Sequence, residues 1–334
     1  MSITSYFSPI NKDKDKKASN SGSRIADETI EAIEKGFFDL NGTTYDLQLA
    51  VDEVRRSTEY WNPDAKRLVD WADIKIDSSS TQNTQISLLE VSSLQGTRIL
   101  AAQLSLRSSS TSAMSTSPYF SAPSATAATN PKIGLLNFAS ATKPGGGFLN
   151  GASAQEESIA RSSTLYASLT TRNGDEFYKL HKRLNPNSGF YTHAMIYSPS
   201  VLLFRDDMGS WLKPLSVDVL TSAAVNAGDI RTKHRIKDAN QADKRALEAR
   251  IEDVMKERMA RILHLFALNG VRNLVLGSFG TGVFRNNVEV VGRLWKELLI
   301  GAGAPFERAF DRVVFAVLGQ ATFETFEQVF QLDT

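Results

Sequence analysis

The sequence contains no cysteine and only four histidines among its 334 residues. The histidines are His181, His193, His234 and His264. Without cysteine the chain has neither disulfide bonds nor a thiolate nucleophile. Because the histidines are scattered and lack the spacing of metal ligands, we expect neither a structural zinc nor any other cofactor.

Long apolar runs and a strong charge of either sign are missing too. No apolar stretch approaches the ~20 residues that cross a bilayer, and the first residues lack the apolar core of a secretory signal. A formal net charge of +1 argues against a protein that holds nucleic acid by bulk electrostatics. Since 42% of the residues are hydrophobic, we expect a globular intracellular protein of the nucleus or cytoplasm.

The sequence does contain a short apolar run that leads into three consecutive glycines. Residues 133–138, IGLLNF, are typical of a buried strand. Pro144 then ends regular structure, and Gly145, Gly146 and Gly147 allow positive φ and a close approach to a ligand. Successive free backbone N–H groups in such a loop bind anions. The pattern therefore predicts a strand followed by a phosphate-binding loop.

A helix is predicted to begin shortly after the glycines. Ser153 and Glu156 have the S-x-x-E spacing of a capping box, and Glu157 follows at the next position. A helix that begins here holds two adjacent carboxylates within its first turn, close to the glycine loop. On these residues alone, an alternative stays open in which the glycines form a flexible turn and the acidic residues only offset the helix dipole.

Two separate motifs resemble those of one enzyme family. Three glycines, seven residues and then Gln-Glu-Glu at 155–157 are similar to the signature of the poly(ADP-ribose) glycohydrolases, which are macrodomain-fold enzymes. The flanking segments NFASA at 137–141 and RSSTLY at 161–166 resemble the microbial-type branch. About 130 residues later, LGSFGTGVFRN at 276–286 is similar to the second phosphate loop of the family.

The resemblance implies a role for each matching residue. Glu157 is implied to be the catalytic acid/base and Glu156 to hold ribose hydroxyls, with Gln155 supporting the pair. For Phe284, implied to pack on the terminal ribose, an ordinary core aromatic is the alternative. One departure is Lys143, where relatives often carry Asn, so a ribose hydrogen bond is lost or the lysine meets a phosphate. The residues implied to bind substrate are Asn137, Gly145, Gly146, Gly147, Gln155, Gly280, Thr281, Gly282, Val283 and Phe284.

The implied function is hydrolysis of ribose–ribose O-glycosidic bonds in poly(ADP-ribose), which reverses ADP-ribosylation in the DNA damage response. The implied partners are poly(ADP-ribose) and ADP-ribosylated proteins. One alternative is a hydrolase that removes single ADP-ribose units from protein or nucleic acid. Another is a macrodomain that binds ADP-ribose without cleaving it, but binding alone does not need the intact Gln-Glu-Glu triplet.

Composition and the resemblance together predict three parts. Residues 1–24 are polar and are expected to form a disordered arm. The resemblance implies that residues 25–85 pack as an accessory segment on a catalytic domain of residues 86–334. A Ser/Thr-rich stretch at 107–130 is expected to be a flexible insertion in that domain.

The N-terminal arm contains a further pattern, because Ile3, Tyr6 and Phe7 resemble the sliding-clamp interaction box of replication and repair proteins. A sliding clamp is therefore a predicted partner. The alternative is a tail with chance aromatic residues.

Alternating apolar patterns predict an α/β protein, a macrodomain-like three-layer α/β/α sandwich with a mixed, mainly parallel sheet. Both glycine motifs directly follow predicted strands, so we expect them to meet at the carboxyl edge of that sheet. Residues 37–47, with Asn41-Gly42 in the middle, predict a hairpin. The expected helices are 25–35, 46–60, 97–106, 238–268 and 288–300. The expected strands are 86–91, 133–138, 194–204 (one bent strand or a pair), 217–223, 271–276 and 312–318.

Overall fold

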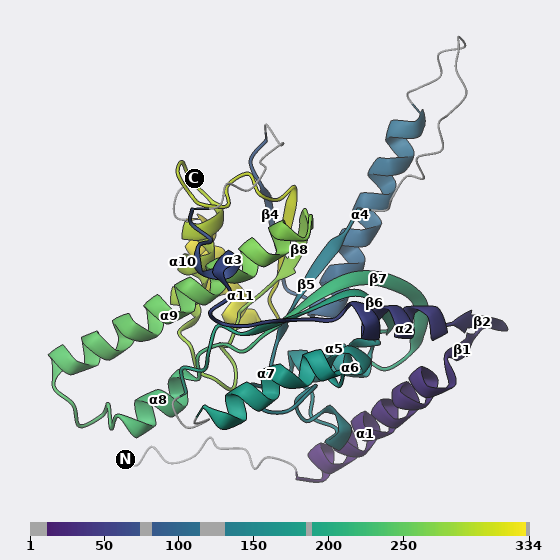
Figure 1. Ribbon diagram of the computed structural model, residues 1–334, viewed down its shortest axis with the longest axis horizontal. Helices are drawn as coiled ribbons and strands as arrows, with labels where there is room; N and C mark the ends of the chain where they lie inside the picture. The colour runs from purple at the N-terminus through teal and green to yellow at the C-terminus, as the bar shows by residue number, and fades with distance from the viewer. Residues whose placement is uncertain (1–11, 74–81, 114–130, 185–188, 332–334) are drawn as a thin grey trace, which may run out of the picture.

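A seven-stranded mixed sheet forms the middle layer of the computed structural model, which describes residues 12–73, 82–113, 131–184 and 189–331 (Figure 1). Four neighbouring pairs of strands are parallel, and the two pairs at one end, β3–β6 and β6–β7, are antiparallel. The prediction of a mixed, mainly parallel sheet is thus confirmed. In spatial order the strands are β3 (Glu59–Trp61), β6 (Met195–Arg205), β7 (Trp211–Ser222), β5 (Ile133–Phe138), β8 (Asn273–Leu276), β9 (Arg312–Ala316) and β4 (Gln85–Leu89).

Helices cover both faces of this sheet, which confirms the three-layer sandwich (Figure 1). One face carries α3 (Lys66–Val69), α8 (Ala227–Lys233), α9 (Gln241–Leu268), α10 (Val288–Leu299) and α11 (Gln320–Gln331). The other face carries α1 (Lys12–Lys35), α2 (Gln48–Ser57), α4 (Ser93–Ala113), α5 (Gln155–Arg161), α6 (Leu165–Leu169) and α7 (Arg172–Arg183). A short 3-10 turn, η1 (Phe148–Asn150), precedes α5.

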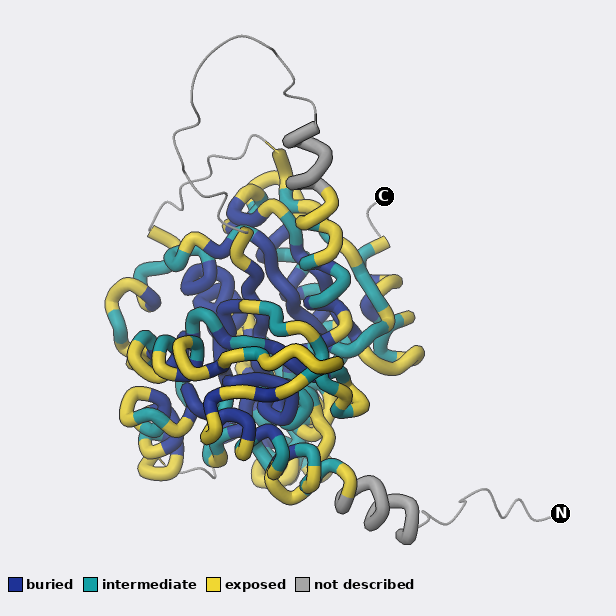
Figure 2. The backbone as a smooth tube through the Cα atoms, turned by 90° about the vertical axis from the view of Figure 1, so that its right-hand side faces the viewer, coloured by how far each residue is buried: buried dark blue, intermediate teal, exposed yellow. Residues whose placement is uncertain are grey.

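Successive strand residues enter two separate cores, as the pleat of a sheet requires. Leu274 packs with the α9 and α10 side chains, whereas its neighbour Val275 packs with those of α4 and α5. The buried backbone accordingly runs through the centre of the molecule, with exposed segments around it (Figure 2). This arrangement buries both faces of β5 and β8, the two strands that lead into the glycine motifs.

Several elements agree with the predictions. Strand β5 spans the expected residues, and β6 is one bent strand with a register shift between Ser198 and Val201. The predicted hairpin consists of β1 (Phe37–Leu40) and β2 (Thr43–Asp46). Asn41 and Gly42 both have positive φ, the conformation that a tight hairpin turn needs.

The N-terminal helix differs from the prediction, because α1 begins at Lys12 rather than at residue 25. Residues 12–24, assigned to a disordered arm, are therefore helical. Tertiary contacts hold the helix on both sides of the predicted boundary. Gly22 lies against Gly151, since a Cβ on Gly22 would be 3.1 Å from the Gly151 backbone, and Thr29 donates a hydrogen bond to the Arg161 carbonyl at 2.7 Å. The proposed clamp-binding residues lie outside the described residues.

Two further boundaries were wrong. The predicted helix over 46–60 ends at Ser57, and Glu59–Trp61 forms the edge strand β3 because it pairs with β6. Helix α4 continues to Ala113, seven residues into the predicted insertion, as an extension of a first half in which Leu94 and Leu100 are buried. Residues 114–130 lie outside the described ranges.

In the ranges that the structure describes, no helix is both long enough and apolar enough to cross a bilayer.

The packing of α9 on β5 predicts a strict requirement for glycine at position 134. A Cβ there would lie 2.6 Å from Cε1 of Phe266 and 2.8 Å from Cδ2 of Leu274. We expect Gly134→Ala to lower the free energy of unfolding by about 1–3 kcal/mol, since a packed core resists an added methyl group. Urea-induced unfolding measures this change.

Gly292 in α10 is the matched control. Its Cβ would approach no atom of Val329 more closely than 3.5 Å, so Gly292→Ala is expected to stabilise the protein by about 0.5–1 kcal/mol. A Gly134→Ala variant as stable as the wild type would contradict the described packing.

Candidate active site

Both glycine motifs line one cavity of about 580 Å³. The first motif follows β5 and the second follows β8, and these two strands are parallel neighbours. The carboxyl ends of the strands therefore meet at one edge of the sheet, as predicted. Ten of the predicted site residues line the cavity: Gly146, Gly147, Gln155, Glu156, Glu157, Gly280, Thr281, Gly282, Val283 and Phe284. The other two, Asn137 and Gly145, do not line it.

The first glycine loop is shaped around the Glu157 carboxylate. Gly145 and Gly146 have φ of 66° and 61°, a conformation that side chains disfavour. A Cβ on Gly146 would overlap Oε1 of Glu157. The backbone N–H of Gly147 donates a hydrogen bond to the same oxygen at 3.0 Å. Glycine at 146 is thus required by the place that this carboxylate occupies.

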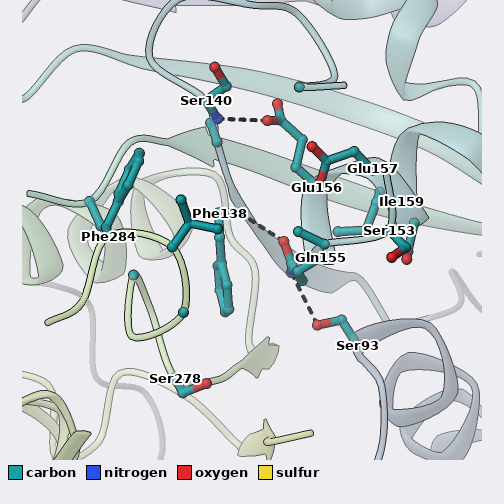
Figure 3. A pocket seen from close by; sticks show the side chains of 18 of the residues that line it. Ser93, Phe138, Ser140, Ser153, Gln155, Glu156, Glu157, Ile159, Ser278 and Phe284 are labelled. Carbon is teal, nitrogen blue, oxygen red and sulfur yellow. Dashed lines mark hydrogen bonds between the residues drawn. The ribbon is translucent and has the colours of Figure 1, made fainter. Parts of the chain in front are cut away.

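The capping box predicted from Ser153 and Glu156 is wrong. Helix α5 begins at Gln155 with Ala154 as its N-cap, and no side chain caps it. The Glu156 carboxylate points inward instead, where its Oε2 accepts a hydrogen bond from the Ser140 N–H at 2.6 Å (Figure 3). Because Ser140 binds this carboxylate, Glu156 is not available to close the capping box.

Gln155 fastens α5 to the sheet. Its Oε1 accepts a hydrogen bond from the Phe138 N–H at 2.9 Å, and its Nε2 donates to the Leu136 carbonyl at 2.7 Å. Nε2 also donates to the Ser93 hydroxyl at 3.1 Å, which connects α4 (Figure 3). One side chain therefore joins α5 to β5 and to α4.

Glu156 lies in a dry and polar environment at the end of the cavity. Its side chain is only 3% exposed. Burial and, to a smaller extent, the negative charge of Glu157 together raise the pKa of Glu156 to about 8, although hydrogen bonds from the N–H groups of Ser140 and Asn137 oppose the shift. Near neutral pH the Glu156 carboxyl is therefore mostly protonated.

Asn137 supports Glu156 from within the protein. Its Nδ2 lies 3.4 Å from Oε1 of Glu156 and donates to the Thr221 hydroxyl on β7 at 3.1 Å. Asn137 is buried in β5, so the structure places it behind the carboxylate pair rather than in the cavity wall.

The second glycine loop is fixed at its base by hydrogen bonds and is exposed at its tip. Nδ2 of Asn286 donates to the carbonyls of Gly280 and Val225, at 2.9 and 2.7 Å, and so ties the loop to the segment after β7. No atom lies within 4 Å of a Cβ built on Gly282, and Val283 is 82% exposed. A ligand can therefore approach the backbone of this tip closely.

An aromatic pair borders the cavity across from the carboxylates. Phe284 is half-buried and lines the cavity on the side opposite Glu156 (Figure 3). Its ring centroid lies 5.9 Å from that of Tyr191, which also lines the cavity. The sequence analysis missed Tyr191 because no motif surrounds it. Its positive φ of 52° is uncommon for a residue other than glycine, and nothing in the sequence around Tyr191 indicates it.

Lys143, the departure from the family pattern, also lines the cavity, with an exposed side chain. Within the described part of the chain, no three His, Cys, Asp or Glu side chains gather to hold a metal ion. The absence of a cofactor stays a prediction.

The three-layer fold, the two glycine loops at the ends of neighbouring parallel strands and the carboxylate pair define a macrodomain-like glycosidase. The sequence model of the microbial-type PARG catalytic domain, where PARG stands for poly(ADP-ribose) glycohydrolase, matches residues 26–206. The chain belongs to this family. Among curated proteins, none matches the chain in sequence.

Solved structures agree with this assignment over nearly the whole chain. Poly(ADP-ribose) glycohydrolase from Thermomonospora curvata is 34% identical, with a TM-score of 0.74, and the match covers 93% of this chain and 99% of that one. Its complex with the inhibitor ADP-HPD matches with 34% identity, a TM-score of 0.71 and coverage of 92% and 99%. The enzyme from Deinococcus radiodurans in complex with ADP-ribose is 28% identical, with a TM-score of 0.66 and coverage of 88% and 98%.

The raised pKa of Glu156 predicts a stability that falls with pH. A carboxyl whose pKa is about 8 in the folded state and near 4.5 when unfolded stabilises the fold below pH 4.5. This contribution is lost as pH rises to 8, by at most about 1.4 kcal/mol for each pH unit. Glu156→Gln does not titrate, so its stability relative to the wild type should increase from pH 5 to pH 8. Urea unfolding at four pH values measures the difference, and parallel pH curves for the two proteins would refute it.

Proposed function

We propose that the chain hydrolyses ribose–ribose O-glycosidic bonds of poly(ADP-ribose) and releases ADP-ribose. The observation that supports this function best is the carboxylate pair, which lies at the first turn of α5 and faces a cavity bordered by both glycine loops. The membership in the microbial-type family agrees with it.

Glu157 suits the role of acid/base. The Gly147 N–H holds one of its oxygens, and the other has no hydrogen-bond partner among the described residues. As the bond between the anomeric carbon and the bridging oxygen breaks, Glu157 gives its proton to the bridging oxygen. Water then adds to the anomeric carbon and returns a proton to Glu157. The transition state resembles an oxocarbenium ion, and the negative charge that develops on Glu157 as it gives up its proton also stabilises that cation.

Glu156 suits the role of ribose holder. Its two oxygens face the N–H groups of Ser140 and Asn137, which fix the direction of the carboxyl. Glycosidases usually place two carboxyls on opposite sides of the bond. Since Glu156 and Glu157 are neighbours on one helix, one acts in the chemistry and the other binds. Burial of Glu156, helped by the negative charge of Glu157, raises the pKa of Glu156 to about 8, so the pair retains a proton near neutral pH.

The second loop suits the diphosphate of the substrate. No atom lies within 4 Å of a Cβ built on Gly282, so an anion can approach the backbone N–H groups of this loop closely. The exposed amine of Lys143 on the opposite loop is placed to approach a phosphate, and Phe284 to pack on the terminal ribose.

The division of labour in the pair leads to a substitution experiment. Glu157→Gln is expected to lower turnover of poly(ADP-ribose) by about 10²- to 10⁴-fold, because removing a general acid/base has this effect. The affinity for ADP-ribose should stay near that of the wild type. Chromatography of released ADP-ribose and calorimetric titration measure the two quantities.

Glu156→Gln is the matched variant, and it should weaken ADP-ribose binding as well as turnover. Parallel assays on mono-ADP-ribosylated protein and DNA separate the proposed activity from removal of single units. Wild-type turnover by Glu157→Gln would show that the acid lies elsewhere.

The substrate also indicates where and with what the protein acts. We propose ADP-ribosylated proteins as carriers of the polymer, in the nucleus or cytoplasm.

We also propose a sliding clamp as a partner that binds Ile3, Tyr6 and Phe7. A peptide of residues 1–20 is expected to bind the clamp weakly, since ordering a tail opposes binding. Its Tyr6→Ala/Phe7→Ala version should not bind, and equal binding of both peptides would remove the clamp from the proposal.

A further inference from the structure

Arg258, in the middle of α9, is a fully buried cation that is bonded only to backbone carbonyls. Its side chain is 0% exposed. Nη1 donates to the Ala223 carbonyl at 2.8 Å, and Nη2 donates to the carbonyls of Phe190 and Tyr191 at 2.9 and 3.4 Å. Among the described residues no carboxylate forms an ion pair with it, and its Nε has no hydrogen-bond partner.

A buried charge without a counter-ion is unfavourable, because burial removes its hydration. Burial lowers the pKa of Arg258 to about 9, and the positive charge of Arg261 contributes, but the guanidinium remains charged at neutral pH. Arg261, three residues later, shows the usual arrangement: it is also buried, and its Nε pairs with Glu257 at 2.6 Å. Helix α9 thus carries one compensated and one uncompensated buried arginine.

Arg258 binds the carbonyls of one residue that lines the cavity, Tyr191, and of two residues, Phe190 and Ala223, that directly precede cavity-lining residues. Tyr191 lines the cavity, and so does Ala224, the residue after Ala223. Ala224 packs directly beneath Gly280, since a Cβ on Gly280 would overlap its methyl group. The guanidinium therefore lies one peptide unit behind the wall that faces the second glycine loop.

We propose that Arg258 is a positioning residue whose charge is balanced by the diphosphate of the bound ligand. A charge close behind a cavity wall attracts an anion strongly, because little water separates the two. Nη2 of the same guanidinium also donates to the carbonyl of Tyr191. This hydrogen bond helps to hold Tyr191 at its φ of 52° beside Phe284. This inference rests on the proposed function, because it takes the ligand to contain a diphosphate.

The experiment separates the charge of Arg258 from its hydrogen bonds. Arg258→Lys loses the forked hydrogen bonds and keeps a charge only while its amine is protonated, which burial favours only at acidic pH, whereas Arg258→Gln loses both. Both variants should unfold at lower temperature than the wild type. ADP-ribose affinity, measured by calorimetry at about pH 5.5, should fall on the order of tenfold in Arg258→Gln and stay within about twofold of the wild type in Arg258→Lys. The matched control is Arg261→Gln, which removes the compensated arginine and should lower stability without changing ADP-ribose affinity.

Equal losses of affinity in Arg258→Lys and Arg258→Gln would overturn the proposal, since the hydrogen bonds alone would then explain them. Should Arg258→Gln fail to fold, Arg258→Lys decides by itself: near-wild-type affinity supports the role of the charge, and a tenfold loss refutes it. Titration of inorganic pyrophosphate into the same proteins separates the role of the Arg258 charge from the proposed hydrolysis. Suppose that the wild type binds pyrophosphate more tightly than Arg258→Gln but does not release ADP-ribose from the polymer. This result would refute the proposed function and still support an anion site that depends on Arg258.

Discussion

The hydrogen bonds of the Gln155 side chain are the interaction on which the rest of the site depends. Pairing of β5 with β8 stops at Leu135, whereas pairing with β7 continues to Phe138. Backbone groups at the end of β5 therefore need other partners, and the Gln155 amide supplies them for Leu136 and Phe138. This fixes the first turn of α5, and with it the direction of both following carboxylates.

From that fixed turn, two chemically identical neighbours acquire different environments. Glu156 points into the protein, where burial keeps its pKa high and the Ser140 N–H holds it. Glu157 remains half-buried at the glycine loop, bound by the Gly147 N–H. A helix turns 100° per residue, so adjacent side chains necessarily face different directions. Once Gln155 fixes the helix, the adjacent positions of the two carboxylates are enough to give them different environments.

The sequence predicted the features that are encoded locally. The apolar run of β5 and the glycines after it are local signals, and so is the Asn41-Gly42 turn. Features that depend on distant partners were missed. The capping box failed because Ser140, outside the helix, binds Glu156. Helix α1 was predicted too short because its first half meets a distant segment, with Gly22 packed against Gly151. For helix α7 a local signal existed, since Phe177 and His181 share its buried face at helical spacing.

The buried polar groups Glu156 and Arg258 are tolerated because a large apolar core stands on each side of the sheet and supplies the stability that their burial costs. Glu156 lies against the core that includes Ile159 and Tyr178, and Arg258 lies within the core that includes Phe266 and Trp295. Each buried polar group lowers stability unless something pairs with it. In the free protein, peptide groups supply only part of that pairing. A ligand with a diphosphate and ribose hydroxyls would complete it, so the same groups that weaken the empty fold are those that favour the bound one.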